Sequence, residues 1–360
     1  MSSKRFIISG GGTGGHIFPA IAIANALKKR LIDCEILFVG AKGRMEMERV
    51  PAAGFAIEGL NIAGFQRGET VSNLTLPFKV LSSMIAAYRI VSRFKPNAAI
   101  GVGGYASGPL LQAANMAGIP TIIQEQNSFA GITNKILAKR ARKICVAYEG
   151  MESIFPAENI VLTGNPVRAE ILNRNINRVD AYKYFGLDQS KDTILIIGGS
   201  LGARTINESV YEYLEATKEN NTQILWQTGK AWAAENKGWK NVMQLPFIDR
   251  MDYAYAIADV IVSRAGALSI AELQNIGKPV ILVPSPNVTD DHQTHNAMAL
   301  VSKDAALLTK DDEAKEKLME RAKALLADKG LKKRLSDNIA QMAIADAADR
   351  IVDEVLKVAK

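Results

Sequence analysis

The sequence predicts an α/β protein made of two similar halves, each a doubly wound parallel sheet covered by helices. Three observations support this prediction. Strand-like and helix-like segments alternate along most of the 360 residues. The strand-like segments are apolar on both faces, which is typical of strands buried in a parallel sheet. The succession of strand, glycine loop and helix that opens the chain occurs again near residue 193, and a chain of this length is too long for one core.

Each element follows from its local pattern. In the first half, apolar runs predict strands and longer runs of helix-forming residues predict helices. Strands are expected at residues 5–10, 35–40, 98–104, 120–125 and 143–148, and helices at 19–31, 108–118 and 133–141. In the second half, strand candidates lie within residues 193–203, 224–229, 242–247, 259–266 and 279–286. The charge-rich segment from about residue 311 to the end is expected to be helical.

The two halves are expected to meet near residues 164–168, where Gly-Asn-Pro signals a turn. This gives a first domain over residues 1–164 and a second over residues 165–340. The last segment, residues 341–360, is expected to be a helix that packs back on the first domain.

Composition excludes several classes of protein. The two cysteines, Cys34 and Cys145, are far apart, so neither a disulfide framework nor a zinc site is expected, and a reducing cytosol is the natural compartment. The N-terminus lacks the pattern of a signal peptide, and no run of 18 apolar residues is present. The net charge of +7 is concentrated in residues 1–165, where 18 Lys and Arg face 10 Asp and Glu, a net of +8. An anionic membrane surface, nucleic acid or a phosphorylated ligand would each explain this charge, as would an ordinary solvated surface.

The first glycine loop, "GGGTGG", contains G-x-G-x-x-G at Gly10, Gly12 and Gly15. Glycine permits a tight turn and close approach of the backbone, and the following helix offers N–H groups to an anion. An NAD site would also need an acid at the end of the second strand, where residues 40–42 read Gly-Ala-Lys, so NAD is disfavoured while NADP stays open. No P-loop motif occurs.

The second glycine loop, "GGSLGA" at residues 198–203, has two interpretations. It matches the G-x-S-x-G nucleophile elbow, and Asp259 and His292 follow Ser200 in the order of a catalytic triad. Two matching glycine loops in two matching halves are better explained by a ligand held between the halves, with Ser200 and nearby N–H groups binding a phosphate.

Two more loops gather candidate site residues. Residues 101–109 form another glycine loop. In "SRAGALSIAEL", a helix is expected to begin near Ala267, and Glu272 is placed to accept hydrogen bonds from a ribose. The polar loop "DDHQTHNA" follows a strand, and the carboxyl ends of parallel strands are where α/β sheets bind ligands.

Taken in order, "GGTGGHIFPA", "GVGGYASGP", "QEQN", "GITNK", "GNPVR", "GGSLGA", "SRAGALSIAE" and "DDHQTHNA" resemble the motifs of the MurG family. The resemblance covers roughly residues 4–300. It implies two Rossmann-like domains facing a cleft, the glycosyltransferase-B fold. It also implies an inverting, metal-independent transfer of N-acetylglucosamine (GlcNAc) from UDP-GlcNAc to undecaprenyl-linked lipid I, which makes lipid II without a cofactor.

The resemblance also assigns roles to residues. Ile248 is expected to contact the uracil through its backbone, and Arg168 and Ser200 to lie beside the diphosphate. Gln293 and Asn296 are expected to hold the sugar hydroxyls, and Tyr105 and Asn134 to bind the acceptor. The remaining donor contacts implied by the resemblance are Thr13, Gly14, Gly15, Asn127, Ala267, Leu268, Ser269, Ile270, Ala271 and Glu272.

The reaction needs a base for the acceptor hydroxyl and charge stabilisation for the departing UDP. Helix N-termini and arginine can carry the leaving-group charge. His16 ends the first glycine loop and can accept a proton near neutral pH, so it is the candidate base. Glu125 is the rival base, and the sequence does not decide between them.

A lipid acceptor requires docking on the membrane. Residues 64–95 mix apolar and basic side chains in a pattern that suits an interfacial helix and loop, and the basic residues at 135–143 add to it. The apolar residues of this segment are Phe65, Leu74, Leu76, Phe78, Leu81, Met84 and Ile85. The protein is therefore expected on the cytoplasmic face of the plasma membrane, as a peripheral protein.

Two rival functions remain open at this point. A UDP-GlcNAc epimerase of the same fold would use the donor site without a lipid acceptor. A non-enzymatic protein that binds a sugar nucleotide or nucleic acid is the other alternative, but the basic half lacks the aromatic pattern that stacks on nucleic-acid bases, so no nucleic acid is expected.

Overall fold

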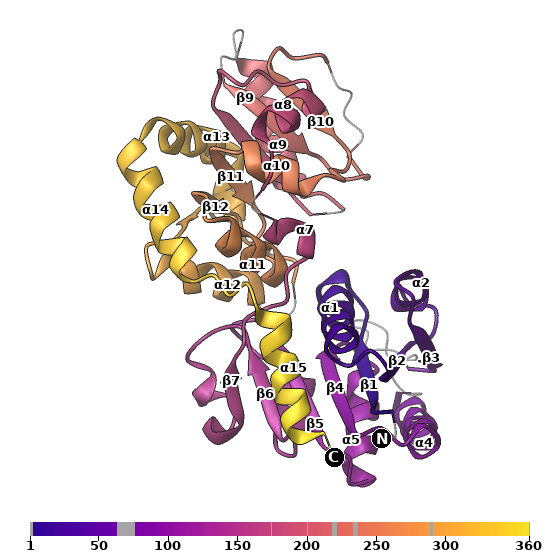
Figure 1. Ribbon diagram of the computed structural model, residues 1–360. Coiled ribbons are helices and arrows are strands. Elements are labelled where there is room, and N and C mark those ends of the chain that lie inside the picture. Colours follow the sequence, from indigo (N-terminus) through magenta and orange to yellow (C-terminus); the bar gives the residue numbers. More distant parts are fainter. Residues whose placement is uncertain are drawn as a thin grey trace. The chain divides into compact units, whose positions relative to one another are not determined.

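The computed structural model describes residues 3–62, 76–173, 175–199, 201–217, 222–232, 237–288 and 291–359, with side chains omitted at 76–79. The chain forms two compact units. The first contains Met1–Val167 and Asp346–Lys360, and the second contains Arg168–Ala345. The sequence predicted that the first domain ends at residue 164 and the second at residue 340. Each unit is described by itself below (Figure 1).

The first unit contains a seven-stranded parallel sheet in the order β3-β2-β1-β4-β5-β6-β7. Its strands are β1 (Arg5–Gly10), β2 (Glu35–Ala41), β3 (Ala56–Leu60), β4 (Ala98–Gly103), β5 (Thr121–Glu125), β6 (Lys143–Val146) and β7 (Ile160–Leu162). The five strands expected in this half are present. Edge strands β3 and β7 were not expected, because an edge strand is only half covered and carries no continuous apolar run.

Helices cover both faces of this sheet. One core, which includes Ile7, Ile123 and Ile144, packs against α4 (Leu76–Phe94), α5 (Ser107–Met116) and α6 (Ile132–Ala138). The other packs against α1 (Gly14–Arg30) and α15 (Ala347–Val358). Both chain termini lie in this unit (Figure 1), and Lys4 Nζ donates to the carbonyl oxygen of Ala359 at 3.3 Å. The remaining elements are α2 (Glu46–Ala52) and the 3-10 helices η1 (Met151–Ser153) and η2 (Ala157–Asn159).

The strand order of this unit reverses direction between β1 and β4. Strands β2 and β3 extend to one side of β1, and β5, β6 and β7 extend to the other side of β4. At such a switch point the loops after the two central strands turn away from each other and leave a crevice for a ligand. The glycine loop at residues 10–13 and the glycine loop at 103–106 are these two loops.

The second unit repeats the arrangement with six parallel strands in the order β10-β9-β8-β11-β12-β13. Its strands are β8 (Thr193–Ile197), β9 (Gln223–Gln227), β10 (Val242–Leu245), β11 (Val260–Ser263), β12 (Val280–Leu282) and β13 (Leu307–Leu308). The switch point lies between β8 and β11, so "GGSLGA" and "SRAG" occupy the places that the two glycine loops hold in the first unit.

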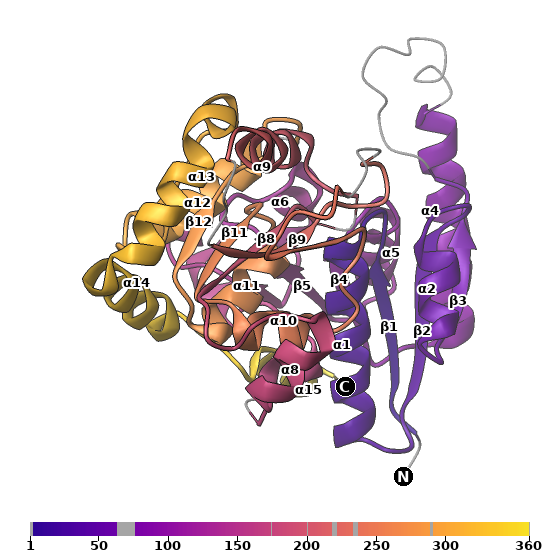
Figure 2. The ribbon, with the colours of Figure 1, turned by 90° about the horizontal axis from the view of Figure 1, so that it is seen from above.

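The helices of the second unit also lie on both faces of its sheet. Side chains of α9 (Arg204–Ala216) and α13 (Asp311–Ala327) share one core with alternate residues of β8, β9 and β11. Both helices are labelled in Figure 2. The other helices are α7 (Ala169–Leu172), α8 (Arg178–Phe185), α10 (Met251–Ile257), α11 (Ala267–Ile276), α12 (His292–Val301) and α14 (Lys329–Gln341). The two doubly wound parallel sheets confirm the predicted fold class.

Candidate active site

The first part of the site is the crevice between the loops that follow β1 and β4. The N–H of Gly11 donates to the carbonyl oxygen of Gly103 at 3.2 Å, which ties the two loops together. Gly104 has φ +90°, and a Cβ there would lie 2.4 Å from the carbonyl oxygen of Gly11. Only glycine fits this position, because both the backbone conformation and the contact exclude a side chain.

His16 lies in the first turn of α1, at this crevice. Its Nδ1 is 3.0 Å from the carbonyl oxygen of Gly11. A carbonyl oxygen only accepts, so Nδ1 carries the hydrogen and Nε2 carries the lone pair of the neutral ring. A Cβ on Gly103 would lie 2.6 Å from the ring, so the missing side chain at 103 makes room for the imidazole.

Thr13, Gly14 and Gly15 form the start of α1. The hydroxyl of Thr13 makes no capping hydrogen bond to this helix, and the side chain is exposed. N–H groups in the first turn have no carbonyl four residues earlier within the helix, so they can donate to an anion or a polar ligand. The predicted donor contacts at these three residues therefore lie beside His16.

Glu125 ends β5 and is buried, with 2% of its surface exposed. One carboxylate oxygen, Oε1, accepts from the backbone N–H of Asn127 at 3.0 Å and from its side-chain amide at 3.2 Å. The other, Oε2, accepts from Nδ2 of Asn134 at 2.8 Å. One buried carboxylate therefore orients two of the predicted ligand residues. Tyr105, in the loop after β4, is 46% exposed.

Glu46 was not identified from the sequence, although it lies under the first glycine loop. Its side chain is 1% exposed. The two oxygens accept from the N–H of Gly12 and from the N–H of Ala41, both at 2.9 Å. A Cβ at Gly11 or Gly40 would collide with Glu46, so these two glycines provide the space for the carboxylate. An acid in a stretch that reads "GRMEMER" gives no sequence signal of burial.

In the second unit, the loop after β8 has positive φ at Gly199 and Gly202, and a Cβ at Gly202 would lie 2.1 Å from the carbonyl oxygen of Thr228. Ser200 lies outside the described residues. The side chain of Gln227 connects this loop to Ile248. Its Nε2 donates to the Gly199 carbonyl at 3.0 Å, and its Oε1 accepts from the Ile248 N–H at 3.1 Å. The N–H of Ile248 is therefore engaged within the unit.

Arg168 and Glu272, two predicted donor ligands, bind each other. Arg168 Nε donates to Glu272 Oε1 at 2.8 Å, and the hydroxyl of Tyr255 donates to Oε2 at 3.0 Å. Burial of the guanidinium opposes its charge, but the hydrogen bond and charge of Glu272 outweigh burial and raise the pKa of Arg168. The tyrosine was not identified from the sequence, which shows only an aromatic residue in a helix.

The residues Ala267 to Glu272, which the resemblance implies as donor contacts, differ in whether their N–H groups are already bonded within the helix. The N–H of Ile270 donates to the carbonyl oxygen of Gly266 at 2.9 Å, and its side chain and that of Ala271 are buried. From the fourth residue onward, N–H groups of an α-helix bond to carbonyls within the helix. Leu268 and Ser269, in the first turn, have no such carbonyl and can donate to a phosphate.

The two sugar-contact candidates differ in exposure. Gln293 is half-buried, and its Oε1 accepts from the N–H of Ser285 at 2.9 Å, which orients its Nε2 group. Asn296 is completely buried, and its Nδ2 donates to the carbonyl oxygen of Ala265 at 3.3 Å. A completely buried amide cannot contact a sugar on the surface, so Asn296 instead supports the loop before α11.

The triad interpretation of "GGSLGA" is wrong. Asp259 Oδ2 accepts from the N–H of Thr193, at the beginning of β8, at 2.8 Å. Gly198 and Gly199 follow the other end of the same strand. The strand therefore separates the aspartate from the loop after β8, so Asp259 cannot serve a triad built on that loop.

Comparisons with known proteins give a consistent result. The chain matches the Glycosyltransferase family 28 N-terminal domain over residues 6–146 and the Glycosyltransferase family 28 C-terminal domain over residues 193–351. It is 56% identical to the UDP-N-acetylglucosamine–N-acetylmuramyl-(pentapeptide) pyrophosphoryl-undecaprenol N-acetylglucosamine transferase of Phocaeicola vulgatus, over 99% of this chain and 96% of the relative.

Solved structures show the same fold. The crystal structure of Acinetobacter baumannii MurG matches with a TM-score of 0.81 and 30% identity, covering 98% of this chain and 99% of that one. The UDP-GlcNAc 2-epimerase of Neisseria meningitidis, bound to UDP-GlcNAc, matches with a TM-score of 0.68 but only 14% identity, over 98% of this chain. At that identity the likeness to the epimerase concerns the fold alone.

Proposed function

The chain belongs to the MurG family of N-acetylglucosaminyltransferases, and from this premise we propose how its residues divide the reaction. The protein transfers GlcNAc from UDP-GlcNAc to lipid I and makes lipid II, a step of peptidoglycan synthesis. The UDP-GlcNAc 2-epimerase of Neisseria meningitidis is only 14% identical to this chain, so its likeness does not support the rival epimerase function. The proposal concerns the base, the donor contacts and the membrane.

We assign His16 as the base. As the MurNAc 4-hydroxyl attacks the anomeric carbon of GlcNAc, Nε2 takes its proton and the bond between that carbon and the diphosphate oxygen breaks. One displacement inverts the anomeric centre. The observation that carries this assignment is the Nδ1–H to Gly11 hydrogen bond, because it fixes the tautomer whose lone pair lies on Nε2.

Glu125 then has a positioning role. Its oxygens already accept three hydrogen bonds from Asn127 and Asn134, and a carboxylate held in this way orients its donors. Asn127 is half-buried and Asn134 is 6% exposed, and Glu125 orients both side chains for the substrate contacts proposed for them. In the rival interpretation, Glu125 takes the proton on the lone pair of Oε2 that these three hydrogen bonds leave, although only 2% of its surface is exposed.

The donor is assigned to the second unit. The first turns of α9 and α11 offer N–H groups to the diphosphate, and Arg168 adds a positive charge. Glu272 accepts from the ribose while Tyr255 holds its other oxygen, and the Nε2 of Gln293 donates to the sugar. These groups supply the stabilisation of the departing UDP, so the transfer needs no metal ion and no cofactor.

The acceptor is lipid-linked, so the protein works at a membrane, and we place it as a peripheral protein on the cytoplasmic face. Among the described residues, no helix is both long and apolar enough to cross a bilayer. On α4, the exposed side chains Leu81, Ile85 and Tyr88 follow one another at helical spacing, beside the exposed Arg89. This stripe suits a helix lying in the interface, and the +8 net charge of residues 1–165 suits an anionic surface.

Four of the apolar side chains predicted to dock on the membrane are not described by the structure. Phe65 and Leu74 fall outside the described residues, and so do the side chains of Leu76 and Phe78. Met84 is half-buried, so it contributes less to an exposed face than Leu81 and Ile85.

The first test is release of UDP from UDP-GlcNAc by the purified protein, with and without a lipid I analogue, in EDTA. We expect release that depends on the analogue and survives EDTA. Loss of turnover in EDTA would contradict the metal-free mechanism, and release without the analogue would contradict the transfer. Glu125→Gln, which keeps one of the two acceptor oxygens but cannot take a proton, separates the two bases: it should cost less turnover than His16→Ala.

A further inference from the structure

The Gly-Asn-Pro turn signal at residues 164–166 contains a buried polar side chain. Asn165 is 4% exposed and lies between β7 and the boundary of the two units. This segment is attached to β6, because the N–H groups of Thr163 and Gly164 both donate to the carbonyl oxygen of Val146, at 3.0 and 3.2 Å. A buried amide needs hydrogen-bond partners, and the partners of Asn165 show what it holds in place.

Asn165 bonds through both ends of its amide to the carboxyl end of β5. Its Oδ1 accepts from Nε2 of Gln124 at 2.8 Å, and its Nδ2 donates to the backbone carbonyl oxygen of Gln126 at 2.9 Å. Gln124 is completely buried, and Gln126 is 2% exposed. The two residues that bond to Asn165 are therefore the two chain neighbours of Glu125.

Gln124 and Glu125 point to opposite faces of the sheet, because successive side chains of a strand alternate. Ile123 belongs to the core that packs against α5 and α6, and Ile122 belongs to the core that packs against α1 and α15. Glu125 shares the face of Ile123, which agrees with its hydrogen bond to a side chain of α6. Asn165 therefore holds the end of β5 from the face opposite the Glu125 carboxylate.

Gln126 extends this network to the carboxyl end of β4. Its Nε2 donates to the carbonyl oxygen of Val102 at 2.6 Å. The next residue is Gly103, whose missing side chain makes room for the ring of His16. Asn165 is thus connected through Gln126 to the end of β4 that lies beside the candidate base.

We propose that Asn165 is a positioning residue of the transfer reaction. It is buried, so it acts through the carboxyl ends of β4 and β5 that it holds rather than by touching a substrate. Loss of one member of a buried network leaves its partners unpaired, and a small displacement of reacting groups slows a reaction strongly. The inference rests on the roles proposed for His16 and Glu125, and it adds a residue that neither role includes.

The test measures kcat with a lipid I analogue for the full-length protein, well below its thermal unfolding transition. Asn165→Ala should lower kcat about tenfold to 10²-fold, because the reacting groups are displaced. UDP affinity, measured by calorimetry, should change less than about twofold, since both of these partners of Asn165 lie in the first unit.

Gln124→Leu keeps most of the side-chain volume and removes the amide that donates to Asn165, so it should also lower kcat. The double variant, Asn165→Ala with Gln124→Leu, should lose no more kcat than the more damaging single variant, because the two side chains act as one unit.

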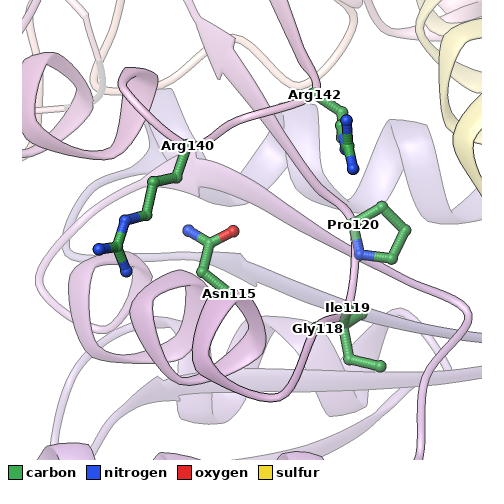
Figure 3. A pocket seen from close by; sticks show the side chains of 6 residues that line it. All are labelled: Asn115, Gly118, Ile119, Pro120, Arg140 and Arg142. Atoms are coloured by element: carbon green, nitrogen blue, oxygen red, sulfur yellow. The ribbon is translucent and has the colours of Figure 1, made fainter.

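Asn115→Ala is the matched control at the other end of β5. The Oδ1 of Asn115 accepts from the hydroxyl of Thr121 at 3.0 Å. Figure 3 shows Asn115 with Arg140 and Arg142, at a hollow of about 350 Å³ beside the amino ends of β5 and β6. The control loses a hydrogen bond of the same kind on the same unit, and its kcat should stay within about twofold of wild type.

Thermal unfolding separates positioning from stability. A purely structural role predicts a lower Tm with an unchanged kcat, and independent roles predict additive losses of kcat in the double variant. Either result overturns the proposal, and so does an equal loss of kcat in Asn115→Ala. If Asn165→Ala does not fold, wild-type kcat in Gln124→Leu overturns it. Wild-type kcat in His16→Ala contradicts the proposed base, whereas wild-type kcat in Asn165→Ala contradicts this inference alone.

Discussion

At the scale of single residues, the structure shows how a few buried groups hold the loops that carry the chemistry. Glu46, Glu125 and Gln227 each use both oxygens, or an oxygen and a nitrogen, to hold backbone or side chains of the site. Buried polar groups of this kind are effective because every hydrogen bond is shielded from water. Substitution of any of these three side chains should lower turnover, although none of them is assigned a direct role in the chemistry.

His16→Ala should lower kcat about 10²- to 10⁴-fold, which is the usual contribution of a general base. Because the donor is assigned to the second unit, UDP binding should change little. Steady-state kinetics with a lipid I analogue and calorimetry with UDP measure the two effects. Turnover close to wild type would refute the assignment of His16 as the base.

Glu46→Gln should lower kcat about tenfold or more, because the amide replaces one of two acceptor oxygens with a donor that faces a backbone N–H. The first glycine loop, and His16 with it, should then shift. UDP affinity serves as the internal control and should stay within about twofold. A variant with wild-type kcat would show that the loop holds its position without this carboxylate.

Cys145 gives a prediction about pH. Burial raises the pKa of its thiol from 9.0 to about 12, and the charge of Glu354 adds to the effect. The folded protein should therefore resist thiol reagents at pH 8, whereas the unfolded chain should react. The pKa of Cys145 is higher in the folded protein than in the unfolded chain. Below pH 9 the thiol is neutral in both states, and its contribution to the free energy of unfolding is fully present. That contribution is lost as the pH rises from 9 towards 12, because the unfolded chain then loses the proton first. Ready labelling of the native protein at Cys145 would contradict this.

At the scale of elements, the helices differ in what their outer faces offer. Helix α1 follows the first glycine loop. It carries the candidate base in its first turn and basic residues in its last turn. Helix α4 exposes Leu81 and Ile85, with 60% and 48% of their surfaces accessible. Exposed apolar side chains on one face of a helix are typical of a surface that binds a membrane or another protein.

Leu81→Glu combined with Ile85→Glu should weaken binding to anionic vesicles by roughly tenfold or more, because burying each apolar side chain is worth about 1.5–3 kcal/mol. Sedimentation with vesicles measures it. Ile32→Glu is the matched control, since Ile32 is 82% exposed on the same unit but lies in the turn between α1 and β2. Equal loss in the control would mean that the added charge alone, and not this helix, decides binding.

At the scale of the whole molecule, the chain returns to its first unit at the end. Ile351, Val352 and Val355 of α15 are completely buried, in one core with Ile23 and Leu27 of α1. The first unit therefore depends on residues from both ends of the sequence. The second unit is built from one continuous stretch.

Ile351→Ala should destabilise the first unit by about 2–5 kcal/mol, through lost burial and the cavity that remains. All three tryptophans, Trp226, Trp232 and Trp239, belong to the second unit. In a urea titration, far-ultraviolet circular dichroism should show an earlier transition while tryptophan fluorescence keeps its midpoint. A parallel shift of both signals would mean that the two units unfold together.

The sequence by itself determined the fold class, because apolar strands that alternate with helices leave few arrangements other than covered parallel sheets. It also determined the family, because the motif residues occur in order along the chain. The short edge strands β3 and β7 escaped detection, since half-covered strands carry no strong apolar pattern.

Only the tertiary structure decided which candidate residues meet one another. Arg168 and Glu272 are 104 residues apart and form one ion pair, and Glu46 reaches Gly12 across 34 residues. It also showed that the N–H of Ile270 is bonded within α11 and that the side chain of Asn296 is buried. The physical reason is that composition and periodicity report on each segment alone, whereas hydrogen-bond partners and burial depend on which segments the sheet order brings together.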